Sequence, residues 1–164
     1  MTRKLALLLA AALFPLAPVT ATEPGTIAGV TDPYKTDAFD PAADPTAAID
    51  AALAAAKASG KPVLLVMGTN GCHDSAWLAN LLGTERFAPV RARYRIVFAD
   101  IGMPHISGQG KHPEVPERFG FRIKGTPTVA ILDAGGHVLN RKKAPKWRNA
   151  ASRSDDDIYN ELMN

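Results

Sequence analysis

The sequence predicts a single α/β domain, and three of its features support this fold class. Two continuous apolar runs, residues 62–67 and 96–99, have the length and composition of strands that are buried on both faces. A helical pattern separates them, so we expect a parallel β-α-β unit at the centre of the domain. A third apolar run at 129–132, the turn at 134–136 and residues 137–139 are typical of a β-hairpin.

The first 21 residues have the pattern of a secretory signal peptide. Arg3 and Lys4 precede an apolar run over residues 5–17, and the small residues at 19–21 suit cleavage after Ala21. The apolar run is shorter than the roughly 20 residues that span a membrane. We therefore expect a periplasmic or secreted protein with no stable membrane span after cleavage.

The expected mature chain is close to neutral. Removal of the leader leaves 143 of the 164 residues, enough for one domain with a buried core. Of the 19 Lys and Arg residues, two lie in the leader, so 17 remain against 16 Asp and Glu residues. This balance argues against a nucleic-acid-binding protein.

The domain is expected over residues 46–164. Residues 22–45 are rich in Pro, Thr, Asp and Gly, which predicts an extended N-terminal segment that lies over the domain and is not a domain itself. Asp44 is a candidate N-cap and Pro45 suits the first helical position. An alanine-rich helix should follow over residues 46–58.

The first strand leads into the only cysteine of the chain, Cys72. Apolar residues recur at helical spacing over 73–83, so we expect Cys72 at the turn between a strand and the N terminus of a helix. Residues 84–94 predict a short or broken helix before the second strand. Residues 101–117 are rich in Gly and Pro and predict a long irregular loop, which in a compact domain is often functional.

The C-terminal part is expected to contain further helical turns. Residues 116–121 suit one or two turns of helix. Residues 141–153 are basic and mostly polar, which favours a connecting segment. Ser154 is a candidate N-cap, and the acidic residues 155–157 suit the first turn of a closing amphipathic helix.

The order of these elements resembles the thioredoxin fold, a central mixed β-sheet flanked by helices, over residues 46–164. Cys72 stands at the N terminus of the helix that follows the first core strand. Thr126 and Pro127 match the cis-proline segment that faces the active cysteine in this family. Residues 71–75, Gly-Cys-His-Asp-Ser, look like the monothiol motif of some exported bacterial thioredoxin-like proteins.

The sequence departs from thioredoxin at three positions. Ser75 occupies the place of the second, resolving cysteine, and Gly71 replaces the tryptophan that usually precedes the first one. Val66 lies where thioredoxins bury an acid. The resemblance therefore implies that this chain cannot complete a dithiol reductase cycle alone.

We predict Cys72, His73 and Ser75 as the catalytic residues. The thiolate is the nucleophilic form of cysteine, and a helix N terminus stabilises it through unpaired N–H groups and the helix dipole. His73 could supply a proton or a positive charge beside the sulfur, or simply face solvent. Ser75 could donate a hydrogen bond to the sulfur or cap a backbone N–H. Cys72 itself is either a reactive thiol or an inert remnant.

The resemblance also implies that Gly71, Thr126 and Pro127 bind the substrate. A cis bond before Pro127 would leave the preceding backbone free to pair with an extended substrate beside the sulfur. The alternative is a tight turn with no role in binding.

Three functions follow as hypotheses. In the first, Cys72 attacks a disulfide or oxidised thiol of a partner, and an external thiol resolves the mixed disulfide, as in exchange or isomerase-type reactions. The partners would be protein thiols or disulfides, or a small-molecule thiol, and no cofactor is expected. In the second, the groove beside Pro127 binds a peptide or protein without catalysis.

The third hypothesis is the handling of copper or zinc by Cys72 and His73 together with His105 and His112 of the long loop. Irregularly spaced histidines are more often plain surface residues, so we predict no metal site.

Overall fold

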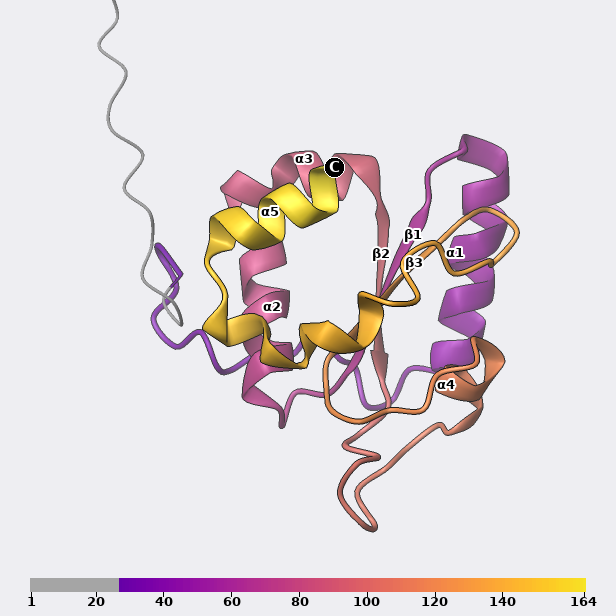
Figure 1. Cartoon of the computed structure of the whole chain (residues 1–164), viewed down its shortest axis with the longest axis horizontal. Coiled ribbons are helices and arrows are strands. Elements are labelled where there is room, and N and C mark those ends of the chain that lie inside the picture. Colours follow the sequence, from indigo (N-terminus) through magenta and orange to yellow (C-terminus); the bar gives the residue numbers. More distant parts are fainter. Residues whose placement is uncertain (1–26) are drawn as a thin grey trace, which may run out of the picture.

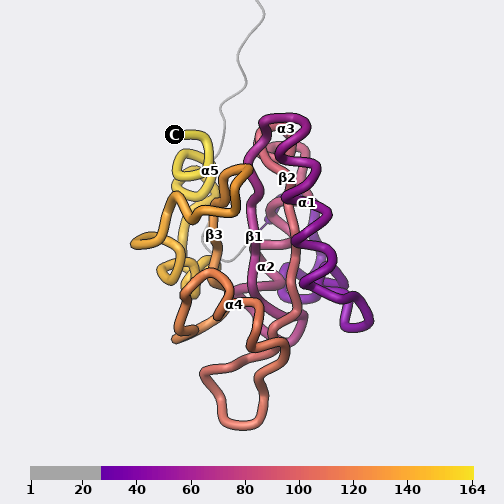
Figure 2. Tube along the Cα trace, turned by 90° about the vertical axis from the view of Figure 1, so that its right-hand side faces the viewer, coloured from indigo at the N-terminus to yellow at the C-terminus, as the bar shows by residue number. Residues whose placement is uncertain are grey.

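The computed structural model describes residues 27–164, and its centre is a three-stranded mixed sheet. Strand β1 (Val63–Gly68) lies in the middle, parallel to β2 (Arg95–Asp100) and antiparallel to β3 (Thr128–Leu132). Figure 2 shows β1 between its two neighbours. All six residues of β1 are buried, as expected for a strand covered on both faces. The predicted cleavage site after Ala21 lies outside the described residues.

Helices cover both faces of this sheet, so the molecule has three layers (Figure 1). One outer layer contains α1 (Pro45–Ser59) and α4 (Glu114–Arg118). The other contains α2 (His73–Gly83), η1 (Glu85–Phe87), α3 (Ala88–Arg93), η2 (Ala144–Ser152) and α5 (Asp155–Met163). Within residues 27–164, none of these helices has the length and apolar character needed to cross a membrane.

Two hydrophobic clusters fill the space on either side of the sheet. Leu64 and Val66 of β1 belong to the cluster that contains Trp77 of α2. Leu65 and Met67, which point the other way, belong to the cluster under α1. The alternation of side chains along the strand therefore joins the sheet to both helical layers.

The N-cap of α1 lies where the sequence predicts it, and a glycine ends the helix. The Asp44 carboxylate accepts hydrogen bonds from the Thr46 and Ala47 amides, and Pro45 is the first helical residue. Gly60, at φ 73°, ends the helix in the left-handed conformation that glycine adopts without steric cost.

The N-terminal segment packs on the domain through side chains of the core elements. The Asn70 amide group exchanges two hydrogen bonds with the Phe39 backbone, at 3.0 and 2.9 Å. Asn80 of α2 donates to the carbonyls of Pro33 and Lys35. The Phe39 ring is fully buried, so this extended segment contributes directly to the core.

The predicted C-terminal hairpin is shorter than expected. Only one pair of residues, Leu132 and Val138, bridges the two arms. The side chain of Asn140 accepts a hydrogen bond from the Ile131 amide and donates one to the Val129 carbonyl. Asn140 and the Leu139 amide, which donates to the Ile131 carbonyl, thus occupy backbone groups at the edge of β3, and no further strand among residues 27–164 pairs there.

The sequence-based expectation of a polar connection at residues 141–153 was wrong. Residues 144–152 form η2, which packs against α2 and β3. Trp147 is buried in the core at 1% exposure. The helix expected at 116–121 also begins earlier, at Glu114.

Candidate functional site

Cys72 is the N-cap residue of α2 and follows the turn that leaves β1. Its backbone is extended (φ −104°, ψ 119°), and its carbonyl accepts the first helical hydrogen bond, from Ala76, at 2.9 Å. Its amide donates to the Thr69 carbonyl at 3.2 Å. Cys72 therefore stands at the end of α2 whose first-turn N–H groups have no carbonyl partner within the helix, although its thiol makes no capping hydrogen bond to them.

Thr126 faces the cysteine across the site, as the family resemblance implies. The Cys72 thiol donates a hydrogen bond to the Thr126 carbonyl, with 3.2 Å between Sγ and the oxygen. The peptide bond between Thr126 and Pro127 is cis. A thiol can donate this bond and a thiolate cannot, so loss of the proton removes the contact. Cys72 is half-buried, whereas Thr126 and Pro127 are buried.

Ser75 does not bond to the sulfur. Its side chain is fully buried, and its hydroxyl has no hydrogen-bond partner among residues 27–164. A Cβ atom added to Gly68 would lie only 2.5 Å from the Ser75 hydroxyl oxygen. The same added atom would lie 3.0 Å from the Phe39 ring. Gly68 therefore makes the room for Ser75, whose hydroxyl packs against the end of β1. Neither the expected bond to sulfur nor a backbone cap is formed.

His73 lies next to the cysteine but pairs with a different residue. Its side chain is 69% exposed, and its Nε2 is 2.8 Å from a carboxylate oxygen of Asp74. Its ring also meets the Tyr34 ring edge-on, with 5.9 Å between centroids. His73 is therefore oriented by the N-terminal segment and by Asp74.

Asp74 is a site residue that the sequence does not reveal. Its carboxylate is 90% buried, and Oδ1 accepts a hydrogen bond of 2.9 Å from the Ala151 amide of η2. The other oxygen holds His73. The carboxylate thereby holds α2 against η2. Its partner, 77 residues away, gives no local signal.

The two other positions at which the chain departs from thioredoxin differ in exposure. Gly71 is exposed, and a Cβ placed on it would meet no atom within 4 Å. Val66 is fully buried in β1. The residue that precedes Cys72 therefore has room for a larger side chain.

A buried carboxylate anchors the loop that carries the cysteine. Asp100, at the end of β2, accepts hydrogen bonds from the Lys111 ammonium at 2.8 Å and the Gly102 amide at 3.0 Å. The Thr69 hydroxyl also bonds to it. Burial, the largest single influence, opposes ionisation, but these bonds and the Lys111 charge together lower the pKa of Asp100 below its ordinary value of 3.8. Asp100 thus ties the cysteine turn to the loop after β2.

The histidines of that loop do not assemble a metal site with the cysteine. His105 is exposed, and the His112 ring is 3.1 Å from the Glu114 carboxylate. Within the described part of the chain, no three His, Cys, Asp or Glu side chains are grouped closely enough to hold a metal ion. The metal hypothesis therefore lacks a ligand set among these residues.

Comparison with known families identifies the fold. Residues 44–134, more than half of the chain, match a family model described as thioredoxin-like. The chain belongs to the thioredoxin-like family. The predicted fold class is thereby confirmed.

A solved structure supports the same assignment for this thioredoxin-like protein. A disulphide isomerase from Xylella fastidiosa Temecula1 superimposes with a TM-score of 0.68 at 28% sequence identity. The match covers 76% of this chain and 93% of the isomerase chain. None of the curated proteins matches the chain. Fold and structural similarity together support thiol–disulfide exchange as the general class of chemistry.

Proposed function

We propose that this thioredoxin-like protein is a periplasmic monothiol protein that exchanges disulfides through Cys72. The observation that carries this proposal is the position of the Cys72 sulfur. It is half-buried at the N terminus of α2 and 3.2 Å from the Thr126 carbonyl, beside Pro127. The similarity to a disulphide isomerase supports the same chemistry.

In the proposed reaction the Cys72 thiolate attacks one sulfur of a partner disulfide. A new S–S bond forms between Cys72 and that sulfur, the original S–S bond breaks, and the departing sulfur leaves as a thiolate that takes a proton from water. A second thiol, from the partner or from a small molecule, then attacks the mixed disulfide and releases Cys72. No net oxidation or reduction of Cys72 results.

The site favours the first step through two features. The N–H groups and the dipole at the start of α2 stabilise a negative sulfur. The Thr126 backbone, which borders the sulfur, is placed to pair with an extended stretch of substrate. Ser75 has no thiol, so release depends on a second thiol from outside the chain.

The exchange reaction is tested by following one defined disulfide through both steps. Incubation with oxidised glutathione should give a mixed disulfide at Cys72, detected by intact-protein mass spectrometry. Addition of a thiol peptide should then transfer the glutathione moiety to the peptide and regenerate the free protein. Cys72→Ser is the control for the adduct. If the folded protein forms no glutathione adduct, the exchange reaction is overturned, and the chain is a binding module with a remnant cysteine.

The proposed location rests on the leader pattern of residues 1–21. Expression of the full chain in a Gram-negative host should yield a periplasmic protein whose first residue is Thr22. Retention of the uncleaved leader in the cytoplasm would overturn the proposed location while leaving the chemistry of Cys72 untouched.

A further inference from the structure

The sheet has a free edge on the side away from β3. Strand β2 pairs with β1 only, and no other strand among residues 27–164 lies beside it. The Arg95 amide donates to the Pro62 carbonyl and the Ile101 amide to the Gly68 carbonyl. In a parallel ladder every second residue bonds to the same neighbour. The N–H and C=O groups of Ile96 and Phe98 therefore point outward, away from β1.

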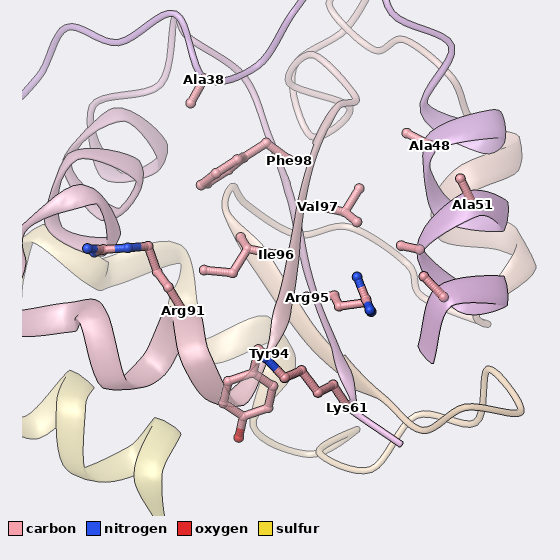
Figure 3. Close-up of a pocket in the computed structure, with 12 residues that line it drawn as sticks. Ala38, Ala48, Ala51, Lys61, Arg91, Tyr94, Arg95, Ile96, Val97 and Phe98 are labelled. Atoms are coloured by element: carbon pink, nitrogen blue, oxygen red, sulfur yellow. The ribbon is translucent and has the colours of Figure 1, made fainter. Parts of the chain in front are cut away.

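A groove runs along this edge (Figure 3). Its volume is about 680 Å³. One wall is the alanine face of α1, formed by Ala48, Ala51, Ala52 and Ala55. The other wall contains Ala38, Arg91 and Tyr94, and the side chains of Ile96 and Phe98 point toward it.

The small side chains of α1 leave this space open. Ile96 and Phe98 are both partly exposed. A strand added at this edge would cover their side chains. An added strand alternates its side chains between the two faces of a sheet. Its residues would meet the alanines of α1 on one face and Ile96 and Phe98 on the other.

The charges of the groove are of one sign. Lys61, Arg91 and Arg95 line it, and no acidic residue of the described chain does. The Arg91 guanidinium is already bonded to the Leu82 and Thr84 carbonyls. Within residues 27–164, the Arg95 guanidinium bonds only to the Ser59 hydroxyl, and neither Arg95 nor Lys61 forms an ion pair. Two cations therefore remain for an acidic occupant.

We propose that the β2 edge binds an extended acidic segment of a partner protein by strand addition. The backbone of Ile96 and Phe98 would supply the hydrogen bonds, and Arg95 and Lys61 would pair with carboxylates of the segment. The groove has walls on both sides of the edge, which suits a single strand better than a second folded copy. This site is separate from Cys72 and does not depend on the exchange reaction.

The proposal is tested by amide hydrogen exchange with a defined probe, the blocked peptide Asp-Val-Thr-Val-Thr-Asp. At a peptide concentration about ten times its dissociation constant, the Ile96 and Phe98 amides should exchange about 10-fold more slowly. A peptide with lysines in place of both aspartates, and one with N-methylated valines, should give no protection. The effect should weaken at high salt.

A matched pair of variants locates the site. Ala51→Tyr fills the groove and should abolish the protection, whereas Ala54→Tyr, on an exposed position of α1 outside the groove, should preserve it. Unchanged exchange of Ile96 and Phe98 at millimolar peptide overturns the proposal. Equal protection by the lysine peptide overturns the acidic specificity. Concentration-dependent protection without any peptide would mean that a second copy occupies the edge.

Discussion

The carboxylate of Asp74 joins the cysteine helix to a segment 77 residues away, because its Oδ1 accepts a 2.9 Å hydrogen bond from the Ala151 amide. The same carboxylate contacts His73. One buried side chain therefore fixes both the seating of α2 and the direction of the histidine beside Cys72.

Removal of this carboxylate should destabilise the domain. Asp74→Ala leaves the buried Ala151 amide without its partner, which costs about 1–3 kcal/mol in the free energy of unfolding. Asp74→Asn keeps an oxygen that can accept the bond and should lose less. Urea unfolding of the three proteins measures the difference, and equal stability of wild type and Asp74→Ala would show that the bond contributes nothing.

Acid should weaken the anchor of the cysteine turn. The folded-state pKa of Asp100 is lowered, so its contribution to stability is present above pH 3.8 and is lost as pH falls through the folded-state pKa. Asp100→Asn should therefore be less stable than wild type at pH 7, and the gap should narrow below pH 3.8. Urea unfolding across this range makes the measurement. If the difference in unfolding free energy between wild type and Asp100→Asn did not change with pH, the stabilising role of the ionised Asp100 carboxylate would be contradicted.

The Tyr94 hydroxyl should stabilise the end of α5, since it donates a 2.7 Å hydrogen bond to the Leu162 carbonyl. Tyr94→Phe removes only the hydroxyl and should cost about 0.5–1.5 kcal/mol of unfolding free energy. Burial raises the pKa of Tyr94, and the positive charge of Arg93 acts against this rise. The contribution of the Tyr94 hydroxyl to the free energy of unfolding is complete below pH 10. It declines as pH rises through the folded-state pKa of Tyr94. Wild type and Tyr94→Phe should therefore converge in stability at high pH.

A second thiol at position 75 should allow the chain itself to resolve a mixed disulfide at Cys72. In Ser75→Cys the new sulfur lies one helical turn from Cys72 and can attack a mixed disulfide from within the chain. The glutathione adduct at Cys72 should then be lost without added thiol, leaving an internal disulfide. Mass spectrometry over time follows both species. Ser75→Ala is the control and should retain the adduct, and an equally long-lived adduct in Ser75→Cys would contradict this expectation.

The sequence predicts the central part of the fold because its signals are local. Continuous apolar runs identify β1 and β2, and Asp44 and Gly60 mark the ends of α1 through their own chemistry. The placement of Cys72 at the start of α2 follows from the same patterns, and the family resemblance implies that Thr126 faces it.

The features that sequence analysis missed depend on distant partners. The Asp74 carboxylate meets an amide of η2, and the Asn140 side chain replaces a strand at the edge of β3. The position of Ser75 depends on the space above Gly68. The buried residues of the basic stretch recur every third position, at Ala144, Trp147 and Ala150, but two of these three are alanines, so the basic and polar residues between them dominate the composition.

The central claim is that the fold makes Cys72 a reactive thiol. The most direct test compares its rate of reaction with oxidised glutathione in the folded protein and in the urea-unfolded chain, both at pH 7. We predict a rate at least several-fold higher in the folded protein, because the start of α2 stabilises the attacking thiolate. An equal or slower rate in the folded protein, after correction for urea, would contradict the claim and leave Cys72 a structural remnant.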